Sequence, residues 1–176
     1  MIKKIITILL LLGIVVFTGG CNSYTAYKDY YTNPNDYSKI WTLAGFYWGY
    51  EEISPLFPKQ LDNLEVADFM CRYDQQLPLG EGVQLLLSIA YEDPTSFERE
   101  VDRIASLTTD RNDSFNDSLL DAYAVRICEE LVSEYALVDS SNQMIYYIYL
   151  RNIPVNEIEI NHELLPHGYT GYGEFN

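Results

Sequence analysis

Two segments near the middle of the chain alternate apolar and polar side chains with the period of two that half-buried β-strands show. The first runs from Leu64 to Tyr73 and the second from Val83 to Tyr91. The stretch between them, Gln75 to Gly82, contains one proline and two glycines, which is typical of a connecting loop. The pattern therefore predicts two strands joined by a loop.

A helix is predicted directly after the second strand. Asp93 is a suitable N-cap, and Pro94 suits the first helical position. Thr95 and Glu98 have the spacing of a capping box. The helical pattern ends near Leu107. Its apolar face consists of Phe97, Val101, Ile104 and Ala105.

The C-terminal half holds further strand signals. Leu119 to Leu131 fits either a helix or a strand in which Tyr123 to Ile127 alternate. Tyr135 to Val138 and Met144 to Leu150 predict a hairpin, which the polar stretch Asp139 to Asn142 would close.

Strands thus lie on both sides of one strong helix, and the connections are too short for crossover helices. This arrangement predicts an α+β fold: an antiparallel sheet of about four to five strands with one main helix packed on one face, as a two-layer sandwich. A chain of 176 residues suits one globular domain of this kind, which we expect to cover residues 37–176.

The first twenty-one residues have a different composition. Lys3 and Lys4 precede an apolar run from Ile5 to Phe17, and small residues precede Cys21. The run is shorter than the roughly 20 residues that a membrane-spanning helix needs. This segment resembles the signal peptides of bacterial lipoproteins. The resemblance implies cleavage before Cys21, attachment of diacylglycerol and palmitate there, and a membrane anchor on the outside of the cell. An ordinary secretion signal and a retained anchor are the alternatives.

Residues 1–20 are accordingly expected to be the signal peptide. Residues 21–36 would be the lipidated cysteine and a flexible tether, because this stretch lacks aliphatic periodicity.

The chain has 26 acidic and 11 basic residues and a formal net charge of −15. Nucleic-acid binding requires clustered Lys and Arg, so this class of function is excluded. We expect no cofactor, and we expect contact with the membrane only through the lipid on Cys21.

Two further cysteines, Cys71 and Cys128, form an even pair if Cys21 carries the lipid. In an exported protein they can form a disulfide, which would contribute about 4 kcal/mol for a loop of this length. The alternative, which we favour, is two buried free thiols, because both residues lie in strand-like segments.

The polar stretch after the predicted helix has the spacing of a calcium loop. Oxygen-bearing side chains occur at alternating positions: Asp110, Asn112, Ser114, Asn116, Ser118 and Asp121. Phe115 replaces the usual glycine, and Asn, Asp and Ser are also ordinary turn residues, so we expect turns rather than a metal site. His162 and His167 are five residues apart with Pro166 between them, which does not fit a zinc-protease helix.

No catalytic constellation is evident. The chain has no G-x-S-x-G motif, and the paired acids Glu98 and Asp102 lie beside arginines, as on a solvated helix face. The run from Tyr91 to Ile104 resembles a pattern in uncharacterised exported proteins of Gram-positive anaerobes, which implies no activity. An enzyme is therefore less expected than a binding protein.

Aromatic residues offer a binding surface instead. Of the 16 tyrosines and two tryptophans, several are concentrated in two segments: Trp41, Tyr47, Trp48 and Tyr50 in one, and Tyr146, Tyr147 and Tyr149 in the other. Such side chains bind glycans or proteins, although tyrosine is also a common packing residue in sheets. We expect a non-enzymatic surface lipoprotein that binds an extracellular protein or glycan. The alternative is a cell-envelope hydrolase that uses carboxylates, assisted by calcium.

Overall fold

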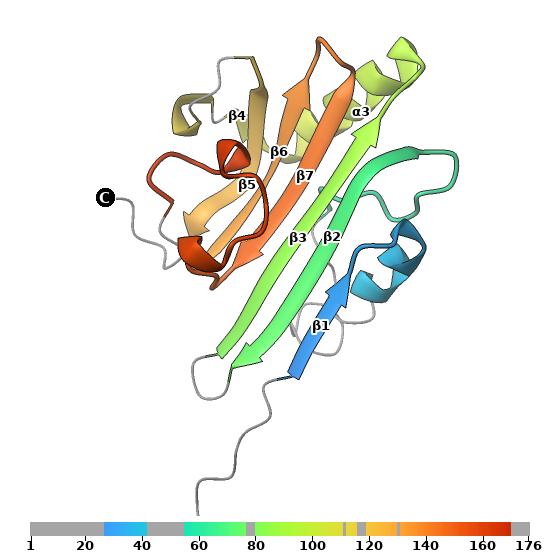
Figure 1. Cartoon of the computed structure of the whole chain (residues 1–176). Helices are drawn as coiled ribbons and strands as arrows, with labels where there is room; N and C mark the ends of the chain where they lie inside the picture. Colours follow the sequence, from blue (N-terminus) through green and yellow to red (C-terminus); the bar gives the residue numbers. More distant parts are fainter. Residues whose placement is uncertain are drawn as a thin grey trace, which may run out of the picture.

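The computed structural model describes residues 27–41, 55–76, 80–110, 112–115, 119–129 and 131–169 (Figure 1). Within them the chain forms one antiparallel sheet with the strand order β1-β2-β3-β7-β6-β5-β4. The strands are β1 (Tyr27–Tyr31), β2 (Glu65–Gln76), β3 (Gly80–Ala90), β4 (Thr109–Asp110), β5 (Asp121–Glu129), β6 (Val132–Asp139) and β7 (Met144–Arg151). The described helices are α3 (Pro94–Leu107) and a short helical segment at residues 37–41.

This architecture corrects the α+β prediction. The sheet has seven strands rather than four or five, the fold is mostly sheet, and the two described helices are short. β1 was missed because its residues are polar or aromatic and show no aliphatic alternation, and β4 because it has only two residues. Side chains cover both faces of the sheet, so the fold has three layers rather than two.

The N-terminal boundary of the domain also differs from the prediction. β1 pairs with β2 from Tyr27↔Gln75 to Tyr31↔Cys71, and a 3-10 helix follows at Pro34–Asp36. The structure therefore places residues 27–36 in the folded domain and not in the tether predicted over 21–36. The predicted signal peptide, Cys21 and residues 22–26 lie outside the described residues.

Helix α3 confirms the predicted helix. The Asp93 carboxylate accepts a hydrogen bond from the backbone N–H of Ser96 at 3.0 Å, and the Ser96 hydroxyl donates to the same carboxylate at 2.7 Å. The Thr95 N–H also donates to this carboxylate, at 3.3 Å, so Asp93 is the capping residue and not the predicted Thr95–Glu98 capping box. Pro94 occupies the first turn, as expected.

One face of the sheet packs against α3, residues 37–41 and the loop around Phe57. The Phe57 ring contacts Tyr147 of β7 with centroids 5.7 Å apart. The buried Tyr147 hydroxyl donates to the Glu100 carboxylate at 2.6 Å, and Arg103 binds Glu100 at 2.8 Å and the Pro55 carbonyl at 2.7 Å. Burial raises the pKa of Tyr147, so its phenol stays protonated and remains a donor. This network connects the helix, the sheet and the loop.

The other face is covered in part by residues 153–169, the C-terminal strap, which lies over β5, β6 and β7 in Figure 1. The Tyr135 hydroxyl of β6 donates to the Leu164 carbonyl at 2.9 Å. The strap contains two 3-10 helices and no strand, so its apolar residues follow no regular period. They pack into a second core: Ile153, Ile158, Ile160, Leu165 and Tyr169.

The sheet consists of two antiparallel meanders that join at its centre. The first is β1-β2-β3 and the second is β4-β5-β6-β7, with α3 between them in the sequence. β3 pairs with β7 from Val83↔Arg151 to Ala90↔Met144. Residues 121–129 form β5, which resolves the ambiguity between helix and strand in favour of the strand.

Candidate binding groove

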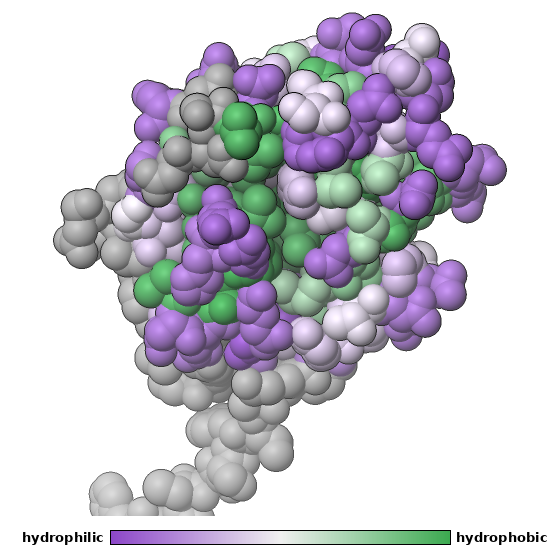
Figure 2. All heavy atoms as spheres, turned by 45° about the horizontal axis from the view of Figure 1, so that its top comes forward, coloured by the Kyte–Doolittle hydropathy of each residue, from purple (hydrophilic) through white to green (hydrophobic). Residues whose placement is uncertain are grey.

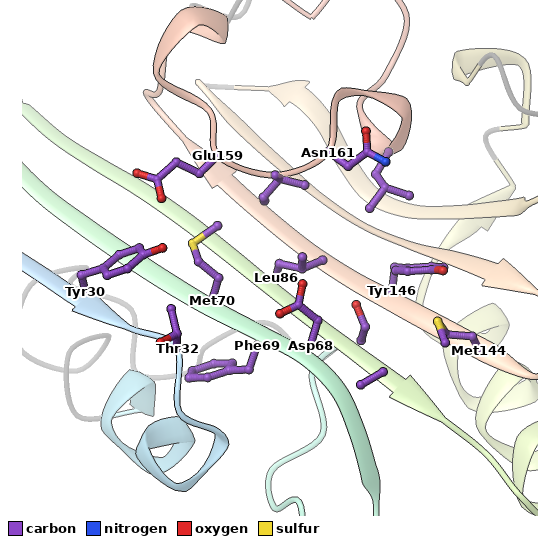
Figure 3. A pocket seen from close by; sticks show the side chains of 14 residues that line it. Tyr30, Thr32, Asp68, Phe69, Met70, Leu86, Met144, Tyr146, Glu159 and Asn161 are labelled. Atoms are coloured by element: carbon purple, nitrogen blue, oxygen red, sulfur yellow. The ribbon is translucent and has the colours of Figure 1, made fainter.

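A groove lies on the strap side of the sheet, where the strap leaves parts of β2 and β3 uncovered (Figure 3). Its volume is about 450 Å³. Pockets for small ligands usually have volumes of roughly 300–1,000 Å³. Figure 2 shows apolar side chains gathered in the interior of this side of the molecule, with hydrophilic side chains around them.

The register of the sheet assembles the floor of the groove. Met70 of β2 lies opposite Leu86 of β3. Asp68 lies opposite Ser88, which lies opposite Tyr146 of β7. Residues two apart on a strand share a face, so these side chains all lie on the strap side. Met70, Leu86 and Ser88 are buried, whereas Asp68 is exposed.

The walls of the groove come from both ends of the described chain. Figure 3 shows side chains of β1 on one side, of β7 on the other and of the strap along the third. They are Tyr30 of β1 and Thr32 just after it, Met144 and Tyr146 of β7, and Glu159, Ile160, Asn161 and Leu164 of the strap. Tyr30 is the most open of the aromatic walls, with 56% of its surface exposed. The groove therefore exists only when β1, β7 and the strap are all in place.

The strap is held at the groove by two side chains of the sheet. Gln84 of β3 is fully buried; its amide donates to the Glu157 carbonyl at 2.8 Å and accepts from the Glu159 N–H at 2.8 Å. Arg72 of β2 donates to the Glu157 carbonyl at 3.0 Å and to the Glu159 carboxylate at 2.8 Å. A buried amide with both partners satisfied fixes the local backbone, so this wall has a defined position.

The groove is electronegative. Its lining contains two carboxylates, Asp68 and Glu159, and no basic side chain. Glu159 is paired with Arg72, which also binds Asp74 at 2.6 Å. No Lys, Arg or His of the described residues forms an ion pair with Asp68. Of the two carboxylates in the lining, Asp68 is thus the one that is available to pair with a ligand.

The two tyrosines of the walls stay neutral. Hydrogen bonding to Glu159 is the main cause that raises the pKa of Tyr30. Burial is the main cause that raises the pKa of Tyr146. Neutral phenols present an aromatic face together with a hydroxyl that donates and accepts, which suits ligand binding.

The polar side chains of the lining are carboxylates, hydroxyls and one amide. The lining contains no histidine and no cysteine. Ser88 is its most deeply placed hydroxyl, and the Asp68 carboxylate lies opposite it on β2.

Of the first predicted aromatic cluster, the structure describes only Trp41. It is half-buried and packs edge-on against Tyr37, with ring centroids 6.1 Å apart, on the α3 side of the sheet. Trp41 is therefore a packing residue. The rest of that cluster lies outside the described residues: Tyr47, Trp48 and Tyr50.

The second aromatic cluster divides between the two faces. Tyr147 and Tyr149 are buried on the α3 side, and Tyr146 lines the groove. Sequence reasoning missed Tyr30, because it lies in the segment interpreted as a tether. The available signal for an edge strand was the presence of three tyrosines, which favour strands, among the polar residues of Tyr27–Tyr31.

The cysteines do not form the disulfide. Cys71 is a buried free thiol, and burial raises its pKa to about 12. Cys128 lies on β5, and its side chain is outside the described part. β2 and β5 are four strand positions apart, which is about 19 Å along the sheet, whereas bridged Cα atoms lie within about 7 Å. The free-thiol alternative therefore describes Cys71.

The candidate calcium loop is not one loop. Its described members are distributed over β4, a 3-10 helix and the start of β5: Asp110, Asn112, Ser114 and Asp121, with Asn116 and Ser118 outside the described residues. Phe115, at the usual glycine position, is buried against Tyr135 with centroids 5.0 Å apart. His162 and His167 are exposed. Among the described residues, no group of three or more potential ligands is placed to hold a metal ion.

One titratable group escaped the sequence analysis. Glu134 of β6 is 1% exposed on the α3 side, where Arg126 of β5 binds its carboxylate at 3.1 Å. Burial raises the pKa of Glu134, and Arg126 lowers it in part. Glu134 lies on the opposite face from the groove, so it does not belong to that site.

In the described part of the chain, no helix is long and apolar enough to cross a membrane. No protein-family model matches this chain, and searches of curated proteins and of solved structures found no match.

Proposed function

We propose that this chain is a lipid-anchored lipoprotein on the outside of the cell membrane, and that its domain binds a ligand in the groove without catalysing a reaction. Two features support the proposal. The residues from Lys3 to Cys21 have the pattern of a lipoprotein signal, and the groove combines an apolar floor with aromatic and polar walls.

The groove carries the proposal, because among the described residues it is an uncovered part of a sheet that packs against other segments on both faces. Apolar surface that stays exposed gives the fold no hydrophobic stabilisation. Such surface is typical of sites that bind a partner or a ligand. The lining combines apolar, aromatic and hydrogen-bonding side chains, which is the combination typical of ligand sites.

The anchor and the groove lie close together in this proposal. β1 supplies one wall and begins at Tyr27, six residues after Cys21. Six residues span at most about 20 Å. The ligand would therefore be bound close to the membrane surface and not at the end of a long tether.

Intact mass of the protein recovered from membranes tests the anchor. The expected result is a chain that begins at Cys21 and carries a diacylglycerol-sized increment. The Cys21→Ala variant provides the control and should keep the uncut signal. A wild-type mass that corresponds to residues 1–176 without an increment would contradict the anchor.

Methyl NMR tests the groove. The chain has three methionines: Met70 and Met144 both line the groove, and Met1 belongs to the predicted signal. Labelling with ¹³C-methyl methionine in the detergent-solubilised protein therefore gives two groove signals, which Met70→Leu and Met144→Leu assign. Peptide pools and a neutral cell-wall tetrasaccharide are the probes. We expect one of them to shift both signals; no shift with any probe at millimolar concentration would refute the function.

A further inference from the structure

We propose that the occupant of the groove is an extended peptide segment whose basic side chain pairs with Asp68. This inference rests on the proposed function and names its ligand class. It follows from the charges of the lining, the shape of the floor and the width of the groove.

The charges favour a cation. Arg72, two residues from Met70 on β2, already faces three carboxylates, those of Asp74, Glu157 and Glu159. Asp68 has no partner among the described ion pairs, and the lining itself contains no basic side chain. A Lys or Arg from a ligand would complete the pairing that this chain does not supply.

The floor fits the rest of a basic side chain. Lys and Arg bury an apolar stem and keep the charged head at a polar edge. Met70 and Leu86 supply an apolar floor directly beside Asp68, with Ser88 in the same row. Tyr146 lies in that row on β7, where its ring can face the cation. Figure 3 shows the Asp68 carboxylate directed into the groove between these groups.

The width of the groove fits a short extended peptide. The groove crosses four strands, β1, β2, β3 and β7, which are three spacings of about 4.8 Å and so about 14 Å apart. An extended peptide rises about 3.3 Å per residue, so about four residues cross the groove. One of them can carry the cation, and its neighbours can contact Tyr30 and the strap.

The charge of the whole chain acts in the same direction. A formal net charge of −15 attracts basic segments over long distances and repels anionic glycans. Screening shortens that attraction from about 10 Å at 0.1 M salt to about 3 Å at 1 M. Binding should therefore weaken as the salt concentration rises.

Four pentapeptide pools test the inference, each acetylated and amidated, with a central Lys, Arg, norleucine or Glu and random flanking residues. The Met70 and Met144 methyl signals of the full-length, detergent-solubilised protein report binding. We expect the Lys and Arg pools to bind at least fivefold more tightly than the norleucine pool, and the Glu pool to bind least.

Asp68→Asn provides the decisive comparison. It should reduce affinity for the Lys pool by about five- to tenfold and abolish the difference from norleucine. Glu98→Gln, an exposed position on α3 on the opposite side of the sheet, changes the net charge equally and should leave that difference intact.

The outcomes separate the two proposals. Equal binding of the Lys and norleucine pools, or an Asp68→Asn protein that binds like wild type, overturns the basic-peptide inference while groove binding stands. Methyl shifts with the tetrasaccharide alone also overturn the inference and identify a glycan site. Failure of every probe to shift the methionine signals overturns both.

Discussion

Replacing Arg126 by alanine is expected to destabilise the fold by an amount that depends on pH. The substitution leaves the Glu134 carboxylate buried, because its side chain is only 2% exposed and Arg126 is the partner of its ion pair. A hydrogen bond to a charged group contributes about 1.5–3 kcal/mol. The Arg126 side chain is 26% exposed, so the pair is partly solvated, and we expect a loss of about 2 kcal/mol at pH 8. For a chain of this size that lowers Tm by about 6 °C.

The direction of the pH dependence follows from the raised pKa of Glu134. The folded protein binds the proton of this group more tightly than the unfolded chain, so its contribution to stability is greatest below the ordinary pKa of a glutamate. That contribution decreases as pH rises towards the folded pKa. Arg126 lowers this pKa, so removing Arg126 raises it further. At a pH above both the folded and the unfolded pKa of Glu134, each additional pKa unit lowers the free energy of unfolding by about 1.4 kcal/mol. The loss should be smaller at pH 5 than at pH 8.

Urea unfolding followed by circular dichroism at pH 5 and pH 8 measures both losses. The double variant Arg126→Ala/Glu134→Gln is the control, and its stability relative to wild type should lack the extra loss at pH 8. Equal losses for the single variant at the two pH values would show that Glu134 is not charged and buried as described, and would refute the reasoning.

Three further experiments test a packing contact, a buried hydrogen bond and a helix cap. Gly82→Ala should cost about 1–2 kcal/mol, because a Cβ there would lie 2.6 Å from Cδ1 of the buried Ile153; Ile153→Val should restore most of it in urea unfolding, and no recovery would contradict that contact. Tyr147→Phe should cost about 1.5–3 kcal/mol by removing the donor to Glu100, and an unchanged urea midpoint would argue against this hydrogen bond. Asp93→Ala should cost about 1 kcal/mol and Asp93→Ser much less; equal thermal shifts for the two would show that the cap contributes little.

Local patterns were sufficient for the elements that depend on near neighbours. α3 follows from its cap and apolar face, and β2, β3 and the β6–β7 hairpin follow from alternation and turn residues. β1 is an edge strand whose existence depends on pairing with β2, more than thirty residues away in the sequence. The strap is held by side chains such as Gln84, and its sequence shows no period that would indicate them. Both escaped prediction because tertiary contacts and not local propensity determine them.

The groove could not be predicted for the same reason. Its lining extends from Tyr30 to Leu164, and these ends meet only because β3 pairs with β7 at the centre of the sheet. The aromatic composition directed attention both to Tyr146, which lines the groove, and to Trp41, which packs half-buried against the core. The burial of Glu134 could not be predicted, because the sequence does not distinguish a single acidic residue on the buried face of a strand from one on its exposed face.

The central pairing of β3 with β7 also determines when the protein can fold. Val83 meets Arg151, so the two meanders cannot join until β7 has been synthesised. Before that moment each meander presents a long free edge, which is prone to pair with other chains. Pairing across so great a sequence separation is also slow, because the entropy of closing the loop is lost before contacts compensate for it. The complete sheet of a nascent chain therefore forms only after β7, in the last fifth of the sequence, has been made.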